Sequence, residues 1–458
     1  MTLPNYFLAD LPPEAALTPA IITEACRALK RNREIYLSGR TTDNVVRLLD
    51  RVAADWLDPQ FPFRQLALEQ GPAALQLSRA TLADGLDSWF RQVTRTNLET
   101  LLAQELGPAG RLDEMVASPA EAQTNRAALA VAPELLAHFT AGNLPVPALS
   151  SIAFGALLRS AQFVKCASGA ELLPRLFAHS IYQADPKLGA CLEIATWPRE
   201  REDLESALFH ELDCLTVTGD DSTLAAIRHQ LPPFVRFVGY GYRVSFAYIT
   251  AGVLSGLNAG RIVRRAATDV AAWDQLGCLS PHLIYVEHGG GISAEQFAEK
   301  LAEELARREE THPRSPLPVE LAATITSRRA FYEIRAAHSP ETKLWRSPDS
   351  TSWTVVYEAD PRFQASCLHR FVYVKGVTGL TEALQAADPV RRHVSTVALA
   401  APEDKAQAMA TELARWGASR ICQLGHMQQP PLTWRHDGRP PLADLFRWAD
   451  WEMAPDES

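Results

Sequence analysis

The amino-acid sequence predicts an α/β protein with parallel sheets, and three observations support this fold class. From about residue 130 onward, short β-branched and aromatic runs alternate with helical stretches. Strands that are joined by helices pack as parallel sheets with right-handed crossovers. The 458 residues are 47% hydrophobic and 22% charged, which is a globular composition, and this length predicts about three domains.

The N-terminal part, residues 1–115, is expected to be mainly helical. Apolar residues recur three and four positions apart in Ile22–Ile35, Asp43–Trp56 and Leu77–Leu106. The last of these segments contains Gly85, and we expect it to break there into two helices. The helical region should end at Gly107, because glycine and proline follow one another from that position.

The next part of the chain has the texture of a Rossmann-like region over residues 130–250. Three strands are expected, and each is followed by a helix. The strands are Phe163–Ala167, Leu192–Thr196 and Cys214–Thr218, and the helices are Ala170–Tyr182, Arg201–Glu211 and Ser222–Arg228.

A second alternating region follows. Its expected strands are Leu283–Glu287, Trp353–Glu358, Phe371–Val374, Ser395–Leu399 and Arg420–Gln423, and its expected helices are Ser293–Arg308, Pro318–Ala337, Thr381–Ala387 and Pro402–Trp416. Asp437-Gly438 is a turn dipeptide, and a Trp-rich helix is expected near Leu442–Trp451.

Charge and hydropathy exclude two classes of partner. The chain has 45 Lys and Arg against 54 Asp and Glu, a net charge of −9. We therefore expect no nucleic-acid partner, because such proteins are usually basic. The two longest uncharged stretches, Phe139–Leu158 and Val244–Gly260, contain Asn and Gly, and neither resembles a spanning helix of about 20 mostly apolar residues. We expect no stable membrane insertion.

Seven cysteines occur, and none belongs to a Cys-x-x-Cys pair. This usage is typical of a reducing compartment rather than of a disulfide framework or a zinc ribbon, so no metal site is expected. Met1–Asp10 shows no signal peptide. Together these features predict a cytoplasmic protein.

His288-Gly-Gly-Gly291 resembles the oxyanion loop of esterases. That interpretation requires a Gly-x-Ser-x-Gly elbow, which the sequence does not contain. The alternative is structural: the glycines end a strand, and Ser293 with Gln296 forms a capping box for the next helix.

Cys278 lies in the segment Asp274-Gln-Leu-Gly-Cys-Leu-Ser-Pro-His282, between a helical stretch and an apolar strand. A loop cysteine of this kind can be presented to a ligand. A lone cysteine is more often a buried small hydrophobe, so Cys278 alone decides nothing.

Three further segments accompany it along the chain. Asn143 lies in a polar loop that leads into an apolar helix, and Lys165-Cys-Ala-Ser168 follows at the end of a strand. Thr218-Gly219-Asp220 begins a turn into a helix whose N-terminus suits an anion. Each has a structural alternative by itself, namely a turn, a solvated lysine and an N-cap.

In this order, the four segments resemble the aldehyde dehydrogenase superfamily. The spacing of Asn143, Lys165, Gly219 and Cys278 is close to that of its Asn loop, Lys-Pro-Ser/Ala-Glu, Phe-Thr-Gly-Ser and Gly-Gln-x-Cys motifs. Within the superfamily, the chain is most similar to the bacterial fatty acyl-CoA reductases, including the long-chain reductase of luminescent bacteria. The segments that carry this resemblance are Gly241–Ala247, Asp274–His282 and the distal Trp434-x-His-Asp-Gly, besides the helical opening.

The resemblance implies an aldehyde-dehydrogenase-like fold in four parts. These are a helical region packed on the cofactor domain (1–115), a Rossmann-like NAD(P)-binding domain (116–250), a catalytic domain bearing the cysteine (251–425) and a C-terminal return segment or oligomerisation arm (426–458). A homo-oligomer is expected, because the superfamily commonly forms dimers or tetramers.

The resemblance also implies roles for the site residues. Cys278 would be the nucleophile and Asn143 an oxyanion donor, and His282 would either orient or protonate a reacting group or be a structural turn histidine. Cofactor contacts would come from Lys165, Ser168, Thr218 and Gly219. Ser168 stands where the superfamily has Glu, which favours NADPH with NADH as the alternative. Asp220 replaces a serine near the phosphates and is expected to point outward or to cap its helix.

One departure bears on the reaction. The superfamily's water-activating Glu precedes the cysteine, whereas the corresponding Gly241–Ala247 has no carboxylate. An acyl-cysteine without such a base escapes hydrolysis, so we expect reduction of a long-chain fatty acyl-CoA, or of an acylated carrier or partner protein, to the aldehyde. A CoA-acylating aldehyde dehydrogenase and a non-catalytic acyl- or nucleotide-binding scaffold are the alternatives.

Overall fold

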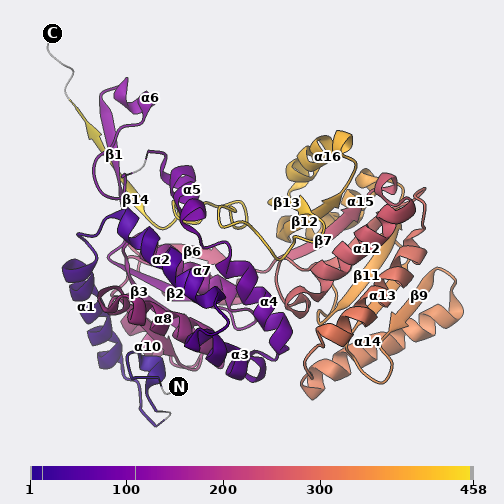
Figure 1. The fold of residues 1–458 in the computed structure, drawn as a ribbon, viewed down its shortest axis with the longest axis horizontal. Helices are drawn as coiled ribbons and strands as arrows, with labels where there is room; N and C mark the ends of the chain where they lie inside the picture. The colour runs from indigo at the N-terminus through magenta and orange to yellow at the C-terminus, as the bar shows by residue number, and fades with distance from the viewer. Residues whose placement is uncertain (1–2, 13, 109, 454–458) are drawn as a thin grey trace. The chain divides into compact units, whose positions relative to one another are not determined.

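The computed structural model describes residues 3–12, 14–108 and 110–453, and the chain divides into two compact units. The first unit comprises Met1–Leu75, Leu86–Gly241 and Pro431–Ser458, and the second comprises Gln76–Gly85 and Tyr242–Pro430 (Figure 1). The expected boundaries at residues 115 and 250 differ from this division. The boundary lies at Gly241 because the strand after it pairs within the second unit's sheet.

The first unit is built on a five-stranded sheet of order β4-β3-β2-β5-β6 in which every neighbouring pair is parallel. The strands are β2 (Leu135–Phe139), β3 (Ala161–Cys166), β4 (Leu192–Thr196), β5 (Cys214–Thr218) and β6 (Arg236–Tyr240). From β2 the chain first winds to one edge of the sheet and then returns to wind to the other, which is doubly wound topology. The α/β class and the Rossmann-like character are confirmed.

Helices surround this sheet. They are α1 (Pro19–Tyr36), α2 (Thr42–Leu57), α3 (Pro62–Leu75), α5 (Arg95–Leu106), α7 (Val146–Leu157), α8 (Leu172–Ala184), α9 (Pro186–Gly189), α10 (Glu202–Phe209) and α11 (Asp221–Gln230). The short helix α6 (Pro119–Ala122) lies instead beside β1 (Arg126–Val131) (Figure 1). One further helix, α4 (Arg79–Phe90), passes straight through Gly85, so the expected break there is wrong. Gly85 instead provides room, because a Cβ at this position would lie 2.1 Å from the ring of Trp273. The interruption comes later, at residues 91–94.

The second unit contains a seven-stranded sheet of order β13-β12-β7-β8-β11-β10-β9. Only β9 runs antiparallel to its neighbour among these described strands. The strands are β7 (Val244–Ile249), β8 (Pro281–Glu287), β9 (Thr342–Arg346), β10 (Thr354–Glu358), β11 (Phe371–Val377), β12 (Val394–Ala400) and β13 (Arg420–Gln423).

Helices cover both faces of this sheet and bury two apolar layers. One layer contains residues of α12 and α13, and the other contains residues of α14, α15 and α16. The helices are α12 (Gly256–Ala271), α13 (Ala294–Thr311), α14 (Val319–His338), α15 (Leu380–Ala387) and α16 (Glu403–Trp416). Short 3-10 turns occur at Leu8–Asp10, Ala251–Val253, Ala272–Gln275 and Asp388–His393. None of the helices in the described ranges is long and apolar enough to cross a bilayer.

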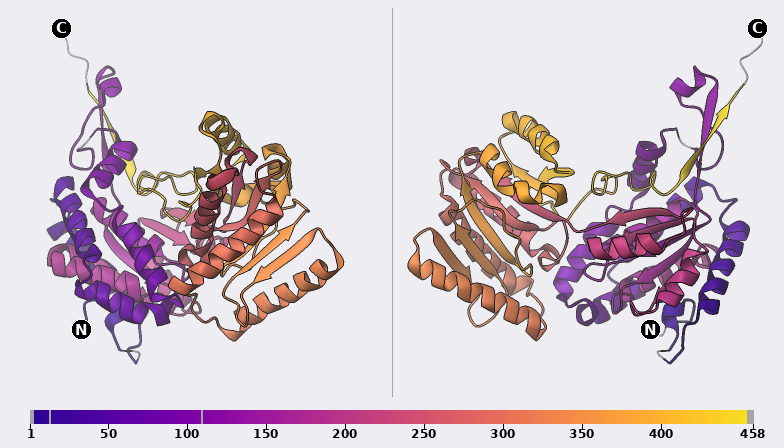
Figure 2. Two further views of the ribbon diagram at one scale, coloured as in Figure 1. Left: turned by 45° about the vertical axis from the view of Figure 1, so that its right-hand side comes forward. Right: turned by 180° about the vertical axis from the view of Figure 1, so that it is seen from behind.

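The C-terminal segment corrects a second expectation. The Trp-rich stretch forms a strand, β14 (Arg447–Glu452), that pairs antiparallel with β1 (Arg126–Val131), as both views of Figure 2 show. The partner strand β1 lies more than 300 residues earlier in the chain, so no local sequence pattern could predict the pairing. The turn at Asp437-Gly438 is confirmed, since both residues have positive φ (52° and 79°) and His436 bridges to Arg439.

Candidate functional site

The carboxyl ends of the central strands carry the first group of predicted site residues. β2 and β5 are neighbours from which the chain leaves toward opposite edges, and ligands of open α/β sheets bind at such a switch point. Thr218 is the last residue of β5, and Gly219 follows it. Asn143 lies exposed in the loop between β2 and α7. One edge of one sheet therefore carries all three.

Lys165 belongs to the same edge, near the end of β3. Its ammonium lies 5.6 Å from the centroid of the Phe139 ring and 5.9 Å from that of Trp197. Burial lowers the pKa of Lys165, and the nearby carboxyl of Glu205 acts in the opposite direction. Ser168 is exposed in the turn that follows. A half-buried cation and an exposed hydroxyl thus stand beside the switch point, where they fit a ribose or a phosphate.

Asp220 caps α11, which is one of its two expected roles. Its Oδ1 accepts from the Thr223 N–H and the Ser222 hydroxyl, each at 2.6 Å. The hydrogen bond from Ser222 is the largest cause that lowers the pKa of Asp220, to about 2. The carboxylate is therefore committed to the first turn of its own helix.

Cys278 is the one exposed residue in the segment 271–280, and it follows an unusual turn. Trp273, Asp274 and Gln275 have left-handed backbone, with φ of 52°, 51° and 66°. Such backbone costs a non-glycine residue about 1–2 kcal/mol. A turn that strains three successive residues needs strong contacts to hold it.

The contacts that hold the Cys278 loop come from several strands. The Ser245 hydroxyl, on β7, donates to the Cys278 carbonyl at 2.7 Å. The Gln275 side-chain amide donates to the carbonyls of Pro281 (2.8 Å) and Phe371 (2.9 Å). A further bond of 2.6 Å joins the Gln428 amide to the Ser280 hydroxyl. The backbone on both sides of the thiol is therefore anchored.

Gly277 allows the close approach of one of these anchors. A Cβ at this position would lie 2.3 Å from Nε2 of Gln428. Any larger residue would displace the amide that binds Ser280.

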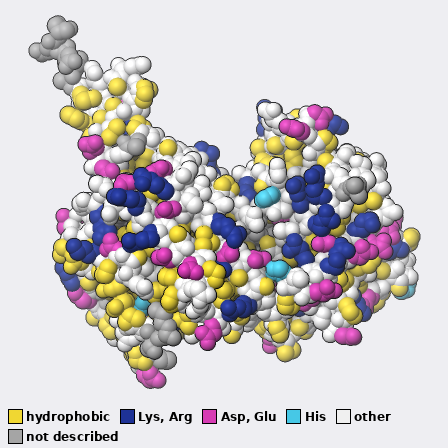
Figure 3. Space-filling model, viewed as in Figure 1, with side chains coloured by type: hydrophobic (Ala, Val, Ile, Leu, Met, Phe, Trp, Pro, Cys, Tyr) yellow, Lys and Arg dark blue, Asp and Glu magenta, His cyan; other side chains and the backbone are white. Residues whose placement is uncertain are grey.

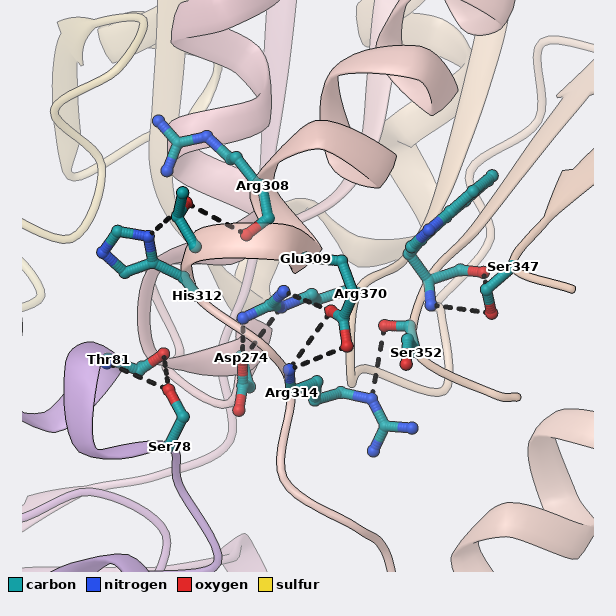
Figure 4. A network of polar contacts seen from close by, with 12 residues as sticks. Ser78, Thr81, Asp274, Arg308, Glu309, His312, Arg314, Ser347, Ser352 and Arg370 are labelled. Atoms are coloured by element: carbon teal, nitrogen blue, oxygen red, sulfur yellow. Dashed lines mark hydrogen bonds and ion pairs between the residues drawn. The ribbon is translucent and has the colours of Figure 1, made fainter. Parts of the chain in front are cut away.

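A buried network of ion pairs contacts the Trp273–Gln275 turn through Asp274. Arg370 is fully buried, and its guanidinium lies between the carboxylates of Asp274 and Glu309 (Figure 4). Burial raises the pKa of Asp274, and the charge of Arg370 opposes this rise.

His282 belongs to a β-bulge at the start of β8. Ser245 pairs with Pro281 and Phe246 pairs with Leu283, so His282 is the additional residue. It is buried, and its Nδ1 accepts from the Ser366 N–H at 3.1 Å. Burial lowers the pKa of His282 to about 4. These contacts favour the structural alternative over a proton-transfer role.

Arg420, on β13, places a positive charge near the thiol. Burial lowers the pKa of Arg420, and the ionised forms of Cys422, Asp269 and Cys278 would favour its cation. Charge interactions are mutual, so the guanidinium also favours the Cys278 thiolate. Arg420 donates to the carbonyls of Met427 (2.6 Å) and His426 (2.8 Å), which fixes its position.

The glycine-rich stretch after β8 has a structural role. Ser293 and Gln296 cap α13 reciprocally, so the expected capping box is confirmed. Gly290 and Gly291 lie against the backbone of residues 251–255, where a Cβ would meet atoms at 2.6–3.1 Å. Within the described ranges, no group of three or more His, Cys, Asp or Glu side chains is placed to hold a metal ion.

Sequence reasoning missed Ser245, Arg370, Arg420 and Glu205. Ser245, Arg370 and Glu205 meet Cys278, Asp274 and Lys165 across 33 to 96 positions of chain, and Arg420 lies 142 positions beyond Cys278. For two of these residues the sequence did offer a signal. Ser245 lies within the segment Gly241–Ala247, and Arg420 is the first residue of the predicted strand Arg420–Gln423.

Comparisons with known proteins identify the family and the fold of the chain. A model of the acyl-CoA reductase (LuxC) family matches residues 37–448. Long-chain acyl-protein thioester reductase of Aliivibrio fischeri is 23% identical over 323 residues, which are 69% of this chain and 63% of that protein. The enzyme of the same name from Vibrio harveyi is 22% identical over 427 residues, covering 91% of this chain and 84% of that protein. The alignment with the first relative thus spans less than two thirds of its length.

Solved structures share the fold. The delta-pyrroline-5-carboxylate dehydrogenase of Mycobacterium tuberculosis superposes with a TM-score of 0.67 at 14% identity, over 97% of this chain and 84% of that one. An NAD-dependent benzaldehyde dehydrogenase of Corynebacterium glutamicum gives 0.69 at 12% identity, over 97% and 91%. At such identities the likeness shows the aldehyde-dehydrogenase-like fold alone, as the sequence predicted.

Proposed function

The chain belongs to the acyl-CoA reductase (LuxC) family, whose members are oxidoreductases acting on acyl thioesters, and we propose that it reduces a long-chain fatty acyl thioester to the aldehyde through an acyl-Cys278 intermediate. The observation that carries the proposal is the presentation of one exposed thiol on an anchored, strained turn. A nucleophile needs such fixed geometry to attack a carbonyl efficiently.

The reaction begins with attack of the Cys278 thiolate on the thioester carbonyl. A thiol with a pKa of about 8.5 is only a few per cent thiolate at neutral pH, so the charge of Arg420 would increase the reactive fraction. The new C–S bond forms as the bond to the donor thiol breaks, and the donor leaves as a thiolate. Asn143 is proposed to donate its amide to the oxyanion, and loss of such a donor typically costs about 3 kcal/mol.

A nicotinamide cofactor would supply hydride to the acyl-cysteine. We propose that Thr218, Gly219, Lys165 and Ser168 hold it, because they share the carboxyl edge of the doubly wound sheet. NADPH is proposed as the better donor, since Lys165 and Ser168 suit a 2′-phosphate. The thiohemiacetal on Cys278 then collapses to aldehyde and thiolate, which restores the enzyme.

The lack of a carboxylate in Gly241–Ala247 supports the proposed reduction over acid formation. Ser245 stands in the segment where the superfamily has its water-activating Glu, and its hydroxyl is bound to the Cys278 carbonyl. Without a base there, an acyl-cysteine persists until hydride or a thiol reaches it.

The acyl donor is proposed to be a fatty acyl-CoA or an acylated protein. Arg261 and Arg264 are exposed on α12, the helix that leads into the Cys278 turn. Figure 3 shows Lys and Arg side chains gathered on the face of the second unit. Such charges favour the phosphates of coenzyme A or an acidic protein surface.

Intact-mass spectrometry after mixing with a long-chain acyl-CoA tests the proposal. One acyl group should appear on the wild type and on Cys367→Ala, a control that removes another partly exposed thiol. It should be missing from Cys278→Ala. An acylated and fully active Cys278→Ala protein would falsify the covalent mechanism. The rate with acyl-CoA plus NADPH is then compared with the rate with aldehyde, CoA and NADP⁺, which separates reduction from the acylating direction. A protein that reacts with no thioester would favour the non-catalytic scaffold.

A homo-oligomer is also proposed, with the β1–β14 ribbon as its arm. Trp448 and Trp451 on β14 are 41% and 53% exposed, and large exposed aromatics are typical of interfaces. Light scattering should show that Trp451→Glu shifts the protein toward the monomer. An unchanged mass for this variant would assign the contact elsewhere.

A further inference from the structure

We propose that Arg370 is a positioning residue for Cys278, because its guanidinium clamps the left-handed turn from which the nucleophile loop departs. The inference rests on the proposed function, since it assigns a task within the attack on the thioester. It concerns a residue that lies 92 positions from Cys278 and contacts Asp274, at the base of its loop.

The clamp consists of two buried ion pairs. Nη2 and Nε of Arg370 lie 2.6 and 2.9 Å from Oδ1 of Asp274, and Nη1 lies 2.9 Å from Oε2 of Glu309. Arg370 is 0% exposed and Asp274 is 1% exposed. Figure 4 shows the guanidinium between the two carboxylates. A buried charge that loses its partner is strongly unfavourable, so each partner holds the others in place.

The clamp joins two strained turns. Leu368, His369 and Arg370 have φ of 62°, 56° and 62°, which is the same left-handed conformation as Trp273–Gln275. The ion pair connects the last residue of one turn to the middle residue of the other. The Gln275 amide adds a bond to the carbonyl of Phe371, the residue after Arg370.

Cys278 follows directly from this double turn. Backbone bonds from the Leu276 N–H to the Trp273 carbonyl (3.0 Å) and from the Ser280 N–H to the Gly277 carbonyl (2.9 Å) extend the fixed geometry to the thiol. A strained turn relaxes when the contact that imposes it is lost. The sulfur would then sample orientations unsuited to the thioester carbonyl.

Arginine is suited to this task because its planar fork can reach two carboxylates at once. Glu309 also accepts from the backbone N–H of Arg314, at 3.1 Å to each oxygen, so its own position is fixed. A lysine would serve one carboxylate as a point charge and leave the other without its partner.

The test compares Arg370→Met with Arg329→Met. Arg329 is a matched control, because it is 5% exposed in the same unit and donates to Thr354, Ser347 and Trp353, which are not part of the Cys278 turn. Three readouts are measured: single-turnover acylation by acyl-CoA, alkylation of Cys278 by iodoacetamide well above the thiol's pKa, and amide exchange of residues 276–280.

In Arg370→Met, acylation should fall about 100-fold, as expected for a misplaced reacting group. Exchange of residues 276–280 should accelerate, while alkylation should change far less, because a small reagent tolerates many orientations. Arg370→Lys should recover part of the acylation rate. Arg329→Met should leave all three readouts near wild type despite a comparable loss of stability. If Arg370→Met does not fold, the isosteric Asp274→Asn carries the same comparison.

Wild-type acylation in Arg370→Met, or an equal loss in Arg329→Met, would overturn the inference. A wild-type protein that no thioester acylates would instead refute the proposed function. Amide exchange then decides the inference alone, and unchanged exchange of residues 276–280 in Arg370→Met would refute it.

Discussion

Gly85→Ala should destabilise the protein, although alanine is the better helix former. A Cβ at residue 85 would lie 2.1, 2.3 and 2.5 Å from Cζ2, Cη2 and Cε2 of Trp273, whose side chain is 5% exposed. Ordinary contacts are more than 1 Å longer, so the indole must shift within a packed core. Overpacking of this kind costs about 1–3 kcal/mol, whereas the helix gains about 1 kcal/mol from the loss of glycine. The net expectation is a loss of up to about 2 kcal/mol.

Urea unfolding measures this loss, with Gly260→Ala as the matched control. Gly260 is also inside a helix of the second unit, but a Cβ there would meet only Arg264 Nη1, at 3.7 Å. Gly260→Ala should therefore stabilise by about 0.4–1 kcal/mol. Because Trp273 opens the left-handed turn before Cys278, Gly85→Ala should also slow acylation. If both substitutions stabilise equally, the close packing of α4 on Trp273 is refuted.

Three further predictions concern the second unit. Gly277→Ala should lower the free energy of unfolding in urea by about 1–3 kcal/mol, because the new Cβ clashes with the Gln428 amide. In a Gln428→Ala background the same substitution should be largely neutral, and additive effects of the two substitutions would contradict this reasoning. Arg420→Met should raise the pH midpoint for alkylation of Cys278, since a cation favours the thiolate, and an unchanged midpoint would remove Arg420 from thiol activation. The pKa of His282 is about 4 in the folded protein, against an ordinary value of 6.5 for histidine. Between these two pH values the unfolded chain binds more protons than the folded chain. The free energy of unfolding therefore falls as the pH decreases from 6.5 to 4. His282→Gln should remove up to about 1.4 kcal/mol per pH unit of this slope, and an unaltered slope would refute the buried neutral ring.

The strands were predictable where the pattern is local. Leu192–Thr196 and Cys214–Thr218 have the predicted bounds, because short β-branched runs between helices leave few alternatives. Strand β7 lay within an uncharged stretch that has no internal period, and every residue of it is buried. Its assignment to the second sheet depends on pairing with β8 and β12, which only the folded chain reveals.

The wrong predictions at Gly85 and in the Trp-rich segment share a physical cause. Gly85 was expected to end a helix, and its actual role is set by an indole 188 residues away. The Trp-rich segment was expected to be helical, and its actual form is set by the backbone of Arg126–Val131. In both cases a tertiary contact overrides the local propensity.

The candidate site likewise contains residues that short motifs identify and residues that only the folded chain identifies. Motif order predicted Cys278, Asn143 and the residues at the sheet edge, because short motifs carry that information. The supporting residues could not be found this way, since Arg370 and Arg420 are 92 and 142 positions beyond the cysteine. The roles proposed for Arg370 and Arg420 rest on burial and charge, which are properties of the folded chain.

In the proposed mechanism, the fate of the acyl group on Cys278 would depend on which nearby carboxylates are available as bases. The two buried aspartates that precede the cysteine in the described chain are both engaged. Asp269 accepts from the backbone N–H groups of Gly425 (2.5 Å) and Met427 (2.8 Å), and Asp274 is paired with Arg370. Ser245 meanwhile offers a hydroxyl that is already donated to the Cys278 carbonyl. In the proposed mechanism, Ser245 and Asp274 anchor the Cys278 loop through the Cys278 carbonyl and Arg370, so the same contacts would position the thiol and keep these two groups from activating water.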